Sequence, residues 1–382
     1  MNKSYSNKIK YCSKCVIPSS SAIPVQFDEN GVCSGCNVAQ QKFEIDWDRR
    51  SKQFNSLLNQ YKSKDNSNYD CIIPVSGGKD SYFQVHMVKN VYKMNPLLVT
   101  YNGNNWTDVG YKNLQNMRNA FGCDHIFFTP NIDLLKRMNR LCFRKMGDMN
   151  WHAHCGIFTY PFIIAVKFNI PLLIYGEHGF MDLGGMHSYN DYVEHTYRYR
   201  HEHSLRGFEW SDMLNDEKDP ITENELLWAK YPNDEDIKKV GVRGIYISNY
   251  VPWLPNENTK LVIEKYGFQV PKEPFDRTYR TMSNLDDMHE NGIHDYLKYI
   301  KFGYGRCTDH VCKDIRDGKL SRGEGIELVK KMDHIKPRDL KRWLEYVNMT
   351  EKEFDEIADT FRDNRVWQKN KNGDWIKDNI WD

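Results

Sequence analysis

No stretch of this 382-residue chain stays apolar for the roughly 18–20 residues that a membrane-spanning helix needs. The first residues, Met1-Asn2-Lys3-Ser4-Tyr5, also lack the apolar core of a secretory signal. An excess of charge of either sign is missing as well, because the formal net charge is +1. No overall field therefore favours nucleic acid or an anionic membrane. We expect a cytoplasmic protein without a membrane partner and without a nucleic-acid partner.

A glutaminase site is also missing. A class I glutaminase needs a Cys on a glycine-flanked elbow, and Cys155-Gly156 lacks the preceding glycine. Asn2 excludes an N-terminal Cys nucleophile. If this protein transfers nitrogen, the ammonia must come from elsewhere.

The 10 cysteines are expected to be reduced thiols or metal ligands, since nothing indicates secretion. Two C-x-x-C pairs, Cys12/Cys15 and Cys33/Cys36, are separated by seventeen residues, which matches a four-cysteine zinc site. Four protein ligands fill the coordination sphere, so the zinc would be structural. Metal binding would supply the folding free energy of this short module. A redox pair and an iron–sulfur cluster are the alternatives.

Short apolar runs alternate with helical patterns in the middle of the chain. The runs at 70–75, 96–100, 125–129 and 171–175 are expected strands. The segments at 79–92, 110–121, 132–145 and 157–168 are expected helices. This alternation predicts an α/β fold with a doubly wound parallel sheet.

Five parts are predicted along the chain. They are the cysteine module (1–45, a zinc ribbon), a helical linker (46–69), the sheet core (70–177), an insertion (178–290) and a helical C-terminal region (291–382). The insertion breaks the alternation and is rich in aromatics, His and charge. We interpret it as a cover over the crevice that selects the substrate.

One turn carries the clearest signal for nucleotide binding. It follows the predicted strand at 70–75 and reads Ser76-Gly77-Gly78-Lys79-Asp80-Ser81. Because glycine has no Cβ atom, backbone N–H groups at these positions can approach phosphate oxygens closely. The spacing differs from the Walker A pattern. Asp80 is placed to hold a magnesium ion that bridges the phosphates. An ordinary strand-to-helix turn is the alternative interpretation.

Other predicted site residues follow two further strands. Tyr101-Asn102 and Gly176-Glu177 come directly after the runs at 96–100 and 171–175. Ligands of such sheets bind beyond the carboxyl ends of the strands. We therefore expect both dipeptides to meet the Ser76–Ser81 turn at one crevice.

Two cations flank a glycine pair near the C-terminal region, in Lys301-Phe302-Gly303-Tyr304-Gly305-Arg306. Lys301 and Arg306 could neutralise a departing pyrophosphate, and a helix C-cap with surface cations is the alternative. His152-Ala-His154-Cys155 could serve a metal or catalysis, but a hydrogen-bonded structural His is the commoner case.

These motifs resemble a known family. The Ser76–Ser81 turn resembles the PP-loop, S-G-G-x-D-S, of the N-type ATP pyrophosphatases, whose fold is adenine-nucleotide α-hydrolase-like. Its order with the cysteine pairs, Asp46-Trp47, Gly176-Glu177 and Gly303–Arg306 looks like the bacterial N-acetyl sugar amidotransferases. These enzymes serve lipopolysaccharide (LPS) O-antigen and pseudaminic or legionaminic acid pathways. The resemblance runs from residue 11 to about residue 330.

The resemblance implies an AMP-forming reaction. A sugar acetamido group would become an acetamidino group through an O-adenylyl imidate, with release of pyrophosphate and AMP. ATP, Mg²⁺ and Zn²⁺ are the implied cofactors. The implied partners are a nucleotide-linked or free acetamido sugar and a glutaminase that supplies ammonia, in some systems with a cyclase-like subunit. The product would enter a surface polysaccharide or a flagellin glycan.

Each predicted site residue then has a role. The phosphates would be cradled by Ser76, Gly77, Gly78, Lys79 and Ser81, with Mg²⁺ on Asp80. Tyr101 and Asn102 would flank adenine or ribose, and Gly176-Glu177 would close the AMP side. Lys301 and Arg306 would receive pyrophosphate. Glu177 would also be the general base that deprotonates the incoming ammonium.

Two other functions remain open on the sequence. A PP-loop tRNA thiolase also fits the cysteine pairs, but it needs a persulfide or cluster cysteine in the crevice, for which Cys155 is the obvious candidate. A zinc-ribbon adaptor that binds nucleotide without turnover is the second alternative.

Overall fold

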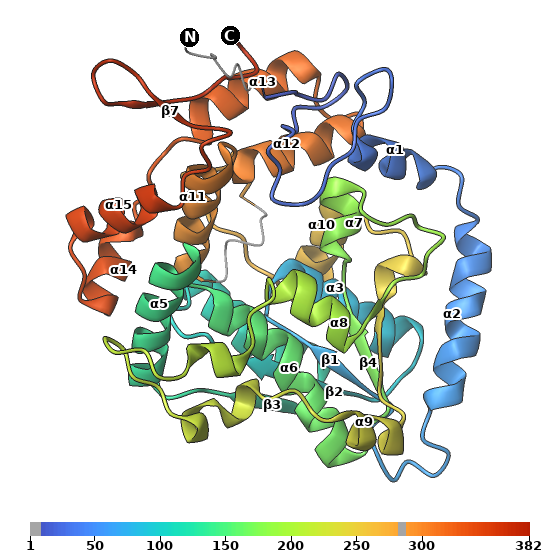
Figure 1. Ribbon diagram of the computed structural model, residues 1–382. Coiled ribbons are helices and arrows are strands. Elements are labelled where there is room, and N and C mark those ends of the chain that lie inside the picture. The colour runs from blue at the N-terminus through green and yellow to red at the C-terminus, as the bar shows by residue number, and fades with distance from the viewer. Residues whose placement is uncertain (1–8, 282–287) are drawn as a thin grey trace.

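The computed structural model describes residues 9–281 and 288–382. These residues form a mixed α/β fold around a six-stranded sheet of order β3-β2-β1-β4-β6-β5 (Figure 1). All neighbouring strands are parallel except β5, which is antiparallel to β6. The strands are β1 Cys71–Pro74, β2 Pro96–Tyr101, β3 His125–Phe128, β4 Leu172–Tyr175, β5 Glu194–His195 and β6 Arg243–Tyr246. The predicted α/β class with a mostly parallel sheet is confirmed.

Helices connect these strands. Up to β4 they are α1 Ser34–Gln41, α2 Trp47–Tyr61, α3 Lys79–Val85 with its π-helical continuation His86–Val91, α4 Asp108–Phe121, α5 Ile132–Met146 and α6 Trp151–Phe168. Between β4 and α11 they are α7 Gly179–Gly184, α8 Tyr197–Tyr199 with the π-turn Arg200–Ser204, the 3₁₀ turns Trp210–Met213, Glu223–Ala229 and Ile247–Asn249, α9 Asp234–Val240 and α10 Pro255–Tyr266. The C-terminal region contains α11 Glu290–Phe302, α12 Arg306–Arg316, α13 Arg322–Met332, α14 Leu340–Val347, α15 Glu351–Thr360 and the hairpin β7 Gln368–Lys369 with β8 Trp375–Ile376.

Hydrophobic side chains of the central strands pack on both faces of the sheet. Ile73 of β1 and Leu98 of β2 belong to one buried cluster, which also contains side chains of α3 and α10. Ile72 and Leu97 point to the other face and join a second cluster with side chains of α6. Successive residues of a strand face opposite sides, so both faces of the sheet are covered by helices. No helix in the described ranges is long and apolar enough to cross a membrane.

The sheet extends past the predicted core boundary at residue 177. β6 pairs in parallel with β4 along its whole length, although it lies in the segment predicted as an insertion. Its apolar part is only a few residues long and is preceded by Arg243, so the sequence pattern was too short to indicate a strand. Helix α6 also begins at Trp151, six residues before the predicted start at 157.

The N-terminal segment packs into the C-terminal region. Its cysteines share a buried cluster with Tyr304 of the α11–α12 turn and with Val311 of α12. Tyr304 Oη accepts a hydrogen bond from the Ala22 N–H at 3.0 Å, and Tyr11 donates its hydroxyl to the Asp378 carbonyl at 3.0 Å. Figure 1 shows the dark-blue N-terminal loops directly beside α12. The two ends of the chain therefore build one structural unit.

Candidate functional site

The predicted phosphate-binding turn lies at the carboxyl end of β1, in the middle of the sheet. Ser76 donates its N–H to Ser81 Oγ at 2.9 Å, and Gly78 donates to Ser76 Oγ at 3.2 Å. Gly77 has φ +82°, and a Cβ atom there would lie 2.8 Å from the backbone of Leu114 in α4. The two serines thus fix the turn from inside, and glycine is required at position 77.

Helix α3 begins directly after this turn. The backbone N–H groups of Lys79, Asp80 and Ser81 donate to no other described residue, as expected for the first turn of a helix. Lys79 Nζ lies 2.7 Å from both carboxylate oxygens of Asp80. The turn therefore offers N–H donors to a phosphate. Its only carboxylate, that of Asp80, is paired with its only lysine, Lys79.

The neighbouring strand β4 ends in the predicted Gly176-Glu177. A Cβ atom on Gly176 would lie 3.3 Å from side-chain atoms of Gln84 and Trp253, so this turn is closely packed. Glu177 forms an ion pair with Lys313 of α12 at 3.3 Å. The end of β4 is thus joined to the C-terminal region by a half-buried pair of opposite charges.

Cations from three segments surround His310 of α12. Burial lowers the pKa of His310 well below its usual range, and four nearby cations lower it further. These cations are Arg280, Arg306, Lys313 and Lys79. His310 also shares a 2.6 Å hydrogen bond with Thr278 through Nδ1. We call the four cations around His310 the cationic cluster; it brings the predicted Lys79 and Arg306 to one place.

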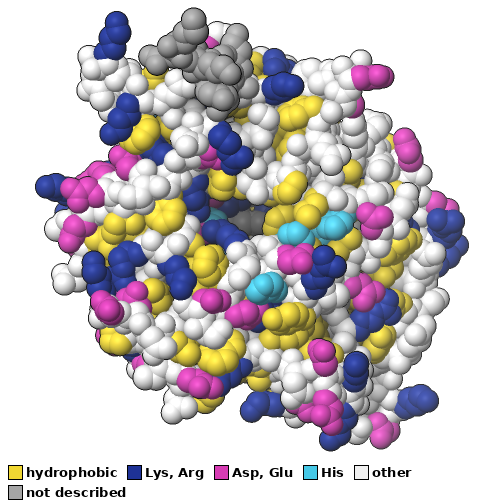
Figure 2. Space-filling model, in the orientation of Figure 1, with side chains coloured by type: hydrophobic (Ala, Val, Ile, Leu, Met, Phe, Trp, Pro, Cys, Tyr) yellow, Lys and Arg dark blue, Asp and Glu magenta, His cyan; other side chains and the backbone are white. Residues whose placement is uncertain are grey.

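Most of this positive charge is compensated by carboxylates. Arg306 makes two bonds to Asp295, at 2.9 and 2.8 Å, and Arg280 pairs with Asp314 at 2.6 Å. Figure 2 shows one face of the molecule, with a hollow near its centre. Lys and Arg side chains lie on one rim of this hollow and His side chains lie on the other. In Figure 1 the same place lies between α11 and α8.

Lys301 lies in a different group from Arg306. Burial lowers the pKa of Lys301 to about 8; the charge of Asp148 opposes this shift and that of Arg206 adds to it. The carboxylate of Asp148 is buried and lies 2.9 Å from His294 Nδ1 and 2.5 Å from Arg206. Lys301 forms no ion pair with another described residue. It is therefore a partly buried cation available to an anion.

Tyr101 and Asn102 have partners within the protein. The Tyr101 ring packs 4.9 Å from that of Trp228, and its hydroxyl lies 3.3 Å from His152 Nδ1. Asn102 Oδ1 accepts from Trp106 at 2.6 Å, and its amide donates to Thr129 at 3.1 Å. Their proposed place beside adenine or ribose stays a prediction. Because both side chains already have partners, their backbone groups would have to contact the nucleotide.

His152 and Cys155 are buried in the first turns of α6, and His154 is half-buried. Burial lowers the pKa of His152 to about 4 and that of His154 to about 3, so both are neutral near pH 7. Cys155 is fully buried, and burial raises its pKa to about 12. A protonated, buried thiol does not support a persulfide-forming cysteine at this position.

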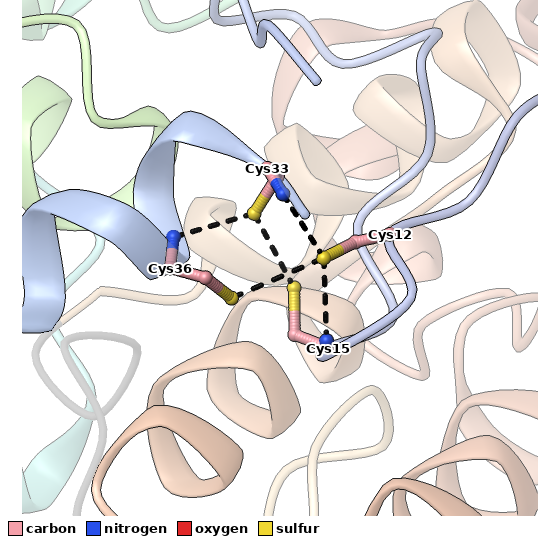
Figure 3. Close-up of side chains that lie close together, drawn as sticks. All are labelled: Cys12, Cys15, Cys33 and Cys36. Carbon is pink, nitrogen blue, oxygen red and sulfur yellow. Dashed lines mark hydrogen bonds between the residues drawn. The ribbon is translucent and has the colours of Figure 1, made fainter. Parts of the chain in front are cut away.

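The four predicted metal ligands come together. Their sulfur atoms lie within 4.8 Å of one another and all four residues are buried (Figure 3). Four backbone N–H groups donate to these sulfur atoms: Lys14, Cys15 and Cys33 to Cys12 at 3.2 to 3.4 Å, and Cys36 to Cys33 at 3.3 Å. Hydrogen bonds, foremost from Cys15, lower the pKa of Cys12. A buried tetrathiol set with N–H donors fits a tetrahedral Zn²⁺.

Five residues of the site were not predicted from the sequence: Arg280, His310, Lys313, Asp148 and His294. Arg306, His310 and Lys313 follow each other at i, i+4 and i+7, which places them on one face of α12, and this spacing was a usable signal. Arg280 carried none, because its place in the cluster depends on the long-range pair with Asp314. Asp148 and His294 were likewise found only in the structure.

Comparison with known proteins identifies relatives of parts of the chain. Residues 262–380 match the family model described as "LPS biosynthesis protein WbpG-like, C-terminal domain". "Uncharacterized protein MJ1599" of Methanocaldococcus jannaschii is 25% identical over 138 residues, which cover 35% of this chain and 49% of that protein. The chain thus spans about half the length of this curated relative. The family match includes the helices that carry Lys301, Arg306 and Lys313, and it supports a role in LPS biosynthesis.

Proposed function

We propose that this protein is an ATP-dependent N-acetyl sugar amidotransferase of LPS or related glycan biosynthesis. It would convert a sugar acetamido group to an acetamidino group and release AMP and pyrophosphate. Ammonia would come from a separate glutaminase. The proposal is supported most by one observation: besides burial, Lys79 of the S-G-G-x-D-S turn lowers the pKa of His310 together with Arg306 and Lys313 of α12, a helix in the segment that matches an LPS biosynthesis domain.

The first step would activate the amide. The acetamido oxygen attacks the α-phosphorus of ATP, the bond to the β-phosphate breaks, and pyrophosphate leaves with the electron pair. Positioning and charge neutralisation supply most of the acceleration of such a transfer. The N–H groups of the Ser76–Ser81 turn would hold the phosphates, and Lys79, Lys301 and Arg306 would neutralise the departing pyrophosphate. A magnesium ion on Asp80 would supply further charge, which requires that Lys79 turn from Asp80 to a phosphate oxygen.

The second step would form the amidine. Ammonia attacks the imidate carbon, the carbon–oxygen bond to AMP breaks, and one proton leaves the new nitrogen. Glu177 remains the proposed general base that deprotonates the incoming ammonium. Its carboxylate lies 3.3 Å from Lys313 of α12.

A direct assay tests the reaction. The protein is incubated with ATP, an ammonium salt and a panel of diacetamido sugars, free and nucleotide-linked. We expect AMP, pyrophosphate and a sugar product that has gained NH and lost oxygen. ADP without AMP, or ATP binding without pyrophosphate release with any acceptor, would exclude the proposal. Asp80→Asn should lose AMP formation, whereas Asp65→Asn, a change in an exposed loop, should keep it.

A further inference from the structure

Helix α12 presents two neighbouring faces to two different sites. One face carries Arg306 and Lys313, which belong to the cationic cluster, and His310, around which the cluster is defined. Arg316 lies about one turn beyond Lys313 and is turned toward the four cysteines. Since the helix is a rigid rod of less than four turns, a shift at one face moves the other.

Arg316 contacts the metal ligands themselves. Its Nη2 atom lies 3.5 Å from Cys33 Sγ and 3.8 Å from Cys15 Sγ, and its Nη1 donates to the Leu183 carbonyl at 3.1 Å. The side chain is nine-tenths buried. A Cβ atom on Gly35 would lie 2.5 Å from Nη2, so the cysteine loop is shaped around the guanidinium.

A charge argument explains why a cation is placed there. Four thiolates around one divalent ion carry two net negative charges, and burying uncompensated charge is costly. The guanidinium supplies one positive charge and two N–H donors to two of the four sulfur atoms. Groups that hydrogen-bond metal ligands typically change metal affinity by about 10- to 100-fold when removed.

We propose that Arg316 stabilises the metal-bound thiolates and, through this contact, ties the position of α12 to the metal centre. The metal centre then sets how tightly the cationic cluster binds pyrophosphate. The second statement rests on the proposed function, whereas the first does not. Arg316 is thus a positioning residue that connects the cysteine site to the phosphate site.

The chain contains a matched control for Arg316. Arg322 of α13 also contacts the cysteine loops, but its guanidinium donates to the carbonyl oxygens of Cys12 and Cys15 at 3.1 to 3.3 Å. Arg322→Gln therefore removes a contact to the same loops without removing a donor to sulfur. Arg316→Lys keeps the charge and serves as the second variant if Arg316→Gln does not fold.

The first experiment follows the metal. In the Co²⁺-loaded protein we expect Arg316→Gln to shift the thiolate-to-cobalt absorption band to longer wavelength, because sulfur that loses N–H donors is a better electron donor. In the Zn²⁺-loaded protein we expect metal transfer to a chelator to be about 10- to 100-fold faster. Arg322→Gln should leave the band in place, and Arg316→Lys should give an intermediate shift. An unchanged band in Arg316→Gln, or an equal shift in Arg322→Gln, would overturn the proposal.

The second experiment follows the anion site by calorimetric titration of the Zn²⁺-loaded variants with pyrophosphate. We expect Arg316→Gln to weaken pyrophosphate binding relative to Arg322→Gln. Equal affinities together with a shifted cobalt band would overturn the connection between the two sites. If the unmodified protein binds neither pyrophosphate nor ATP, the proposed function fails, and the cobalt band still decides the role of Arg316.

Discussion

Lys301 gives the sharpest prediction, because its charge is partly buried and has no carboxylate partner among the described residues. Burial lowers its pKa from the usual 10.5 to about 8. In the unfolded chain the lysine stays protonated up to its ordinary pKa. Between pH 8 and 10.5 the unfolded state therefore binds more protons, and the free energy of unfolding contributed by this group rises with pH. Below pH 8 the group adds no pH dependence.

The size of the effect follows from the shift. A lowering of the pKa from 10.5 to about 8 corresponds to about 3 kcal/mol of destabilisation at pH 7, which deprotonation removes. Lys301→Met should be more stable than the unmodified protein at pH 7 by an amount up to this size. The difference between the two should vanish near pH 10.5. Urea unfolding of both proteins at several pH values measures it, with the exposed Lys341→Met as control.

The same titration should appear in ligand binding. If Lys301 binds pyrophosphate in its charged form, the association constant should fall up to about tenfold per pH unit above pH 8. Lys301→Met should bind more weakly at pH 7 and lack this fall. Parallel pH profiles of Lys301→Met and the unmodified protein, in both stability and pyrophosphate affinity, would refute the assignment.

Three further predictions concern the turn, the C-terminal region and the connection between them. Gly77→Ala should abolish ATP binding measured by calorimetry, because a Cβ at φ +82° meets the backbone of Leu114 at 2.8 Å; retained affinity would mean that the turn adapts. Burial raises the pKa of Glu290 to about 8, above its unfolded value of 4.5, so the unfolding free energy should fall by up to about 5 kcal/mol as the pH rises from 4.5 to 8. Glu290→Gln should remove this fall in urea unfolding at pH 5 and 8, and identical slopes would contradict it. A double-mutant cycle of Glu177→Gln and Lys313→Met should give a coupling of about 1 kcal/mol; additive effects would show that the ion pair does not hold α12 against β4.

The sequence was sufficient for the part of the fold that rests on local patterns. The four strands β1 to β4 are predicted by runs of consecutive apolar residues, which the buried strands β1, β2 and β4 need and which the edge strand β3 also has. β6 was missed because it begins with Arg243 and Gly244, which leaves only a short apolar run. The start of α6 was missed because Asn150 makes no side-chain cap. The sequence around Trp151 therefore contains no capping signal for the start of a helix.

In the site, too, local motifs were predictable from the sequence and long-range contacts were not. The Ser76–Ser81 turn and the two cysteine pairs are contiguous motifs, and the sequence alone predicts them. The cationic cluster depends on contacts such as Glu177 with Lys313, which are 136 residues apart. Spacing along one helix can suggest which residues share a face, but it does not indicate which distant turn that face meets. Arg280 and Asp148 belong to the site only through such contacts.

The packing of the cysteine loops on α12 has a consequence during synthesis. The cysteines leave the ribosome well before α12, and at about 5–20 residues per second the interval is on the order of tens of seconds. For that time the nascent loops lack the guanidinium and the apolar surface that later enclose them. A metal captured by the newborn chain would protect these thiols from oxidation until the last helices arrive.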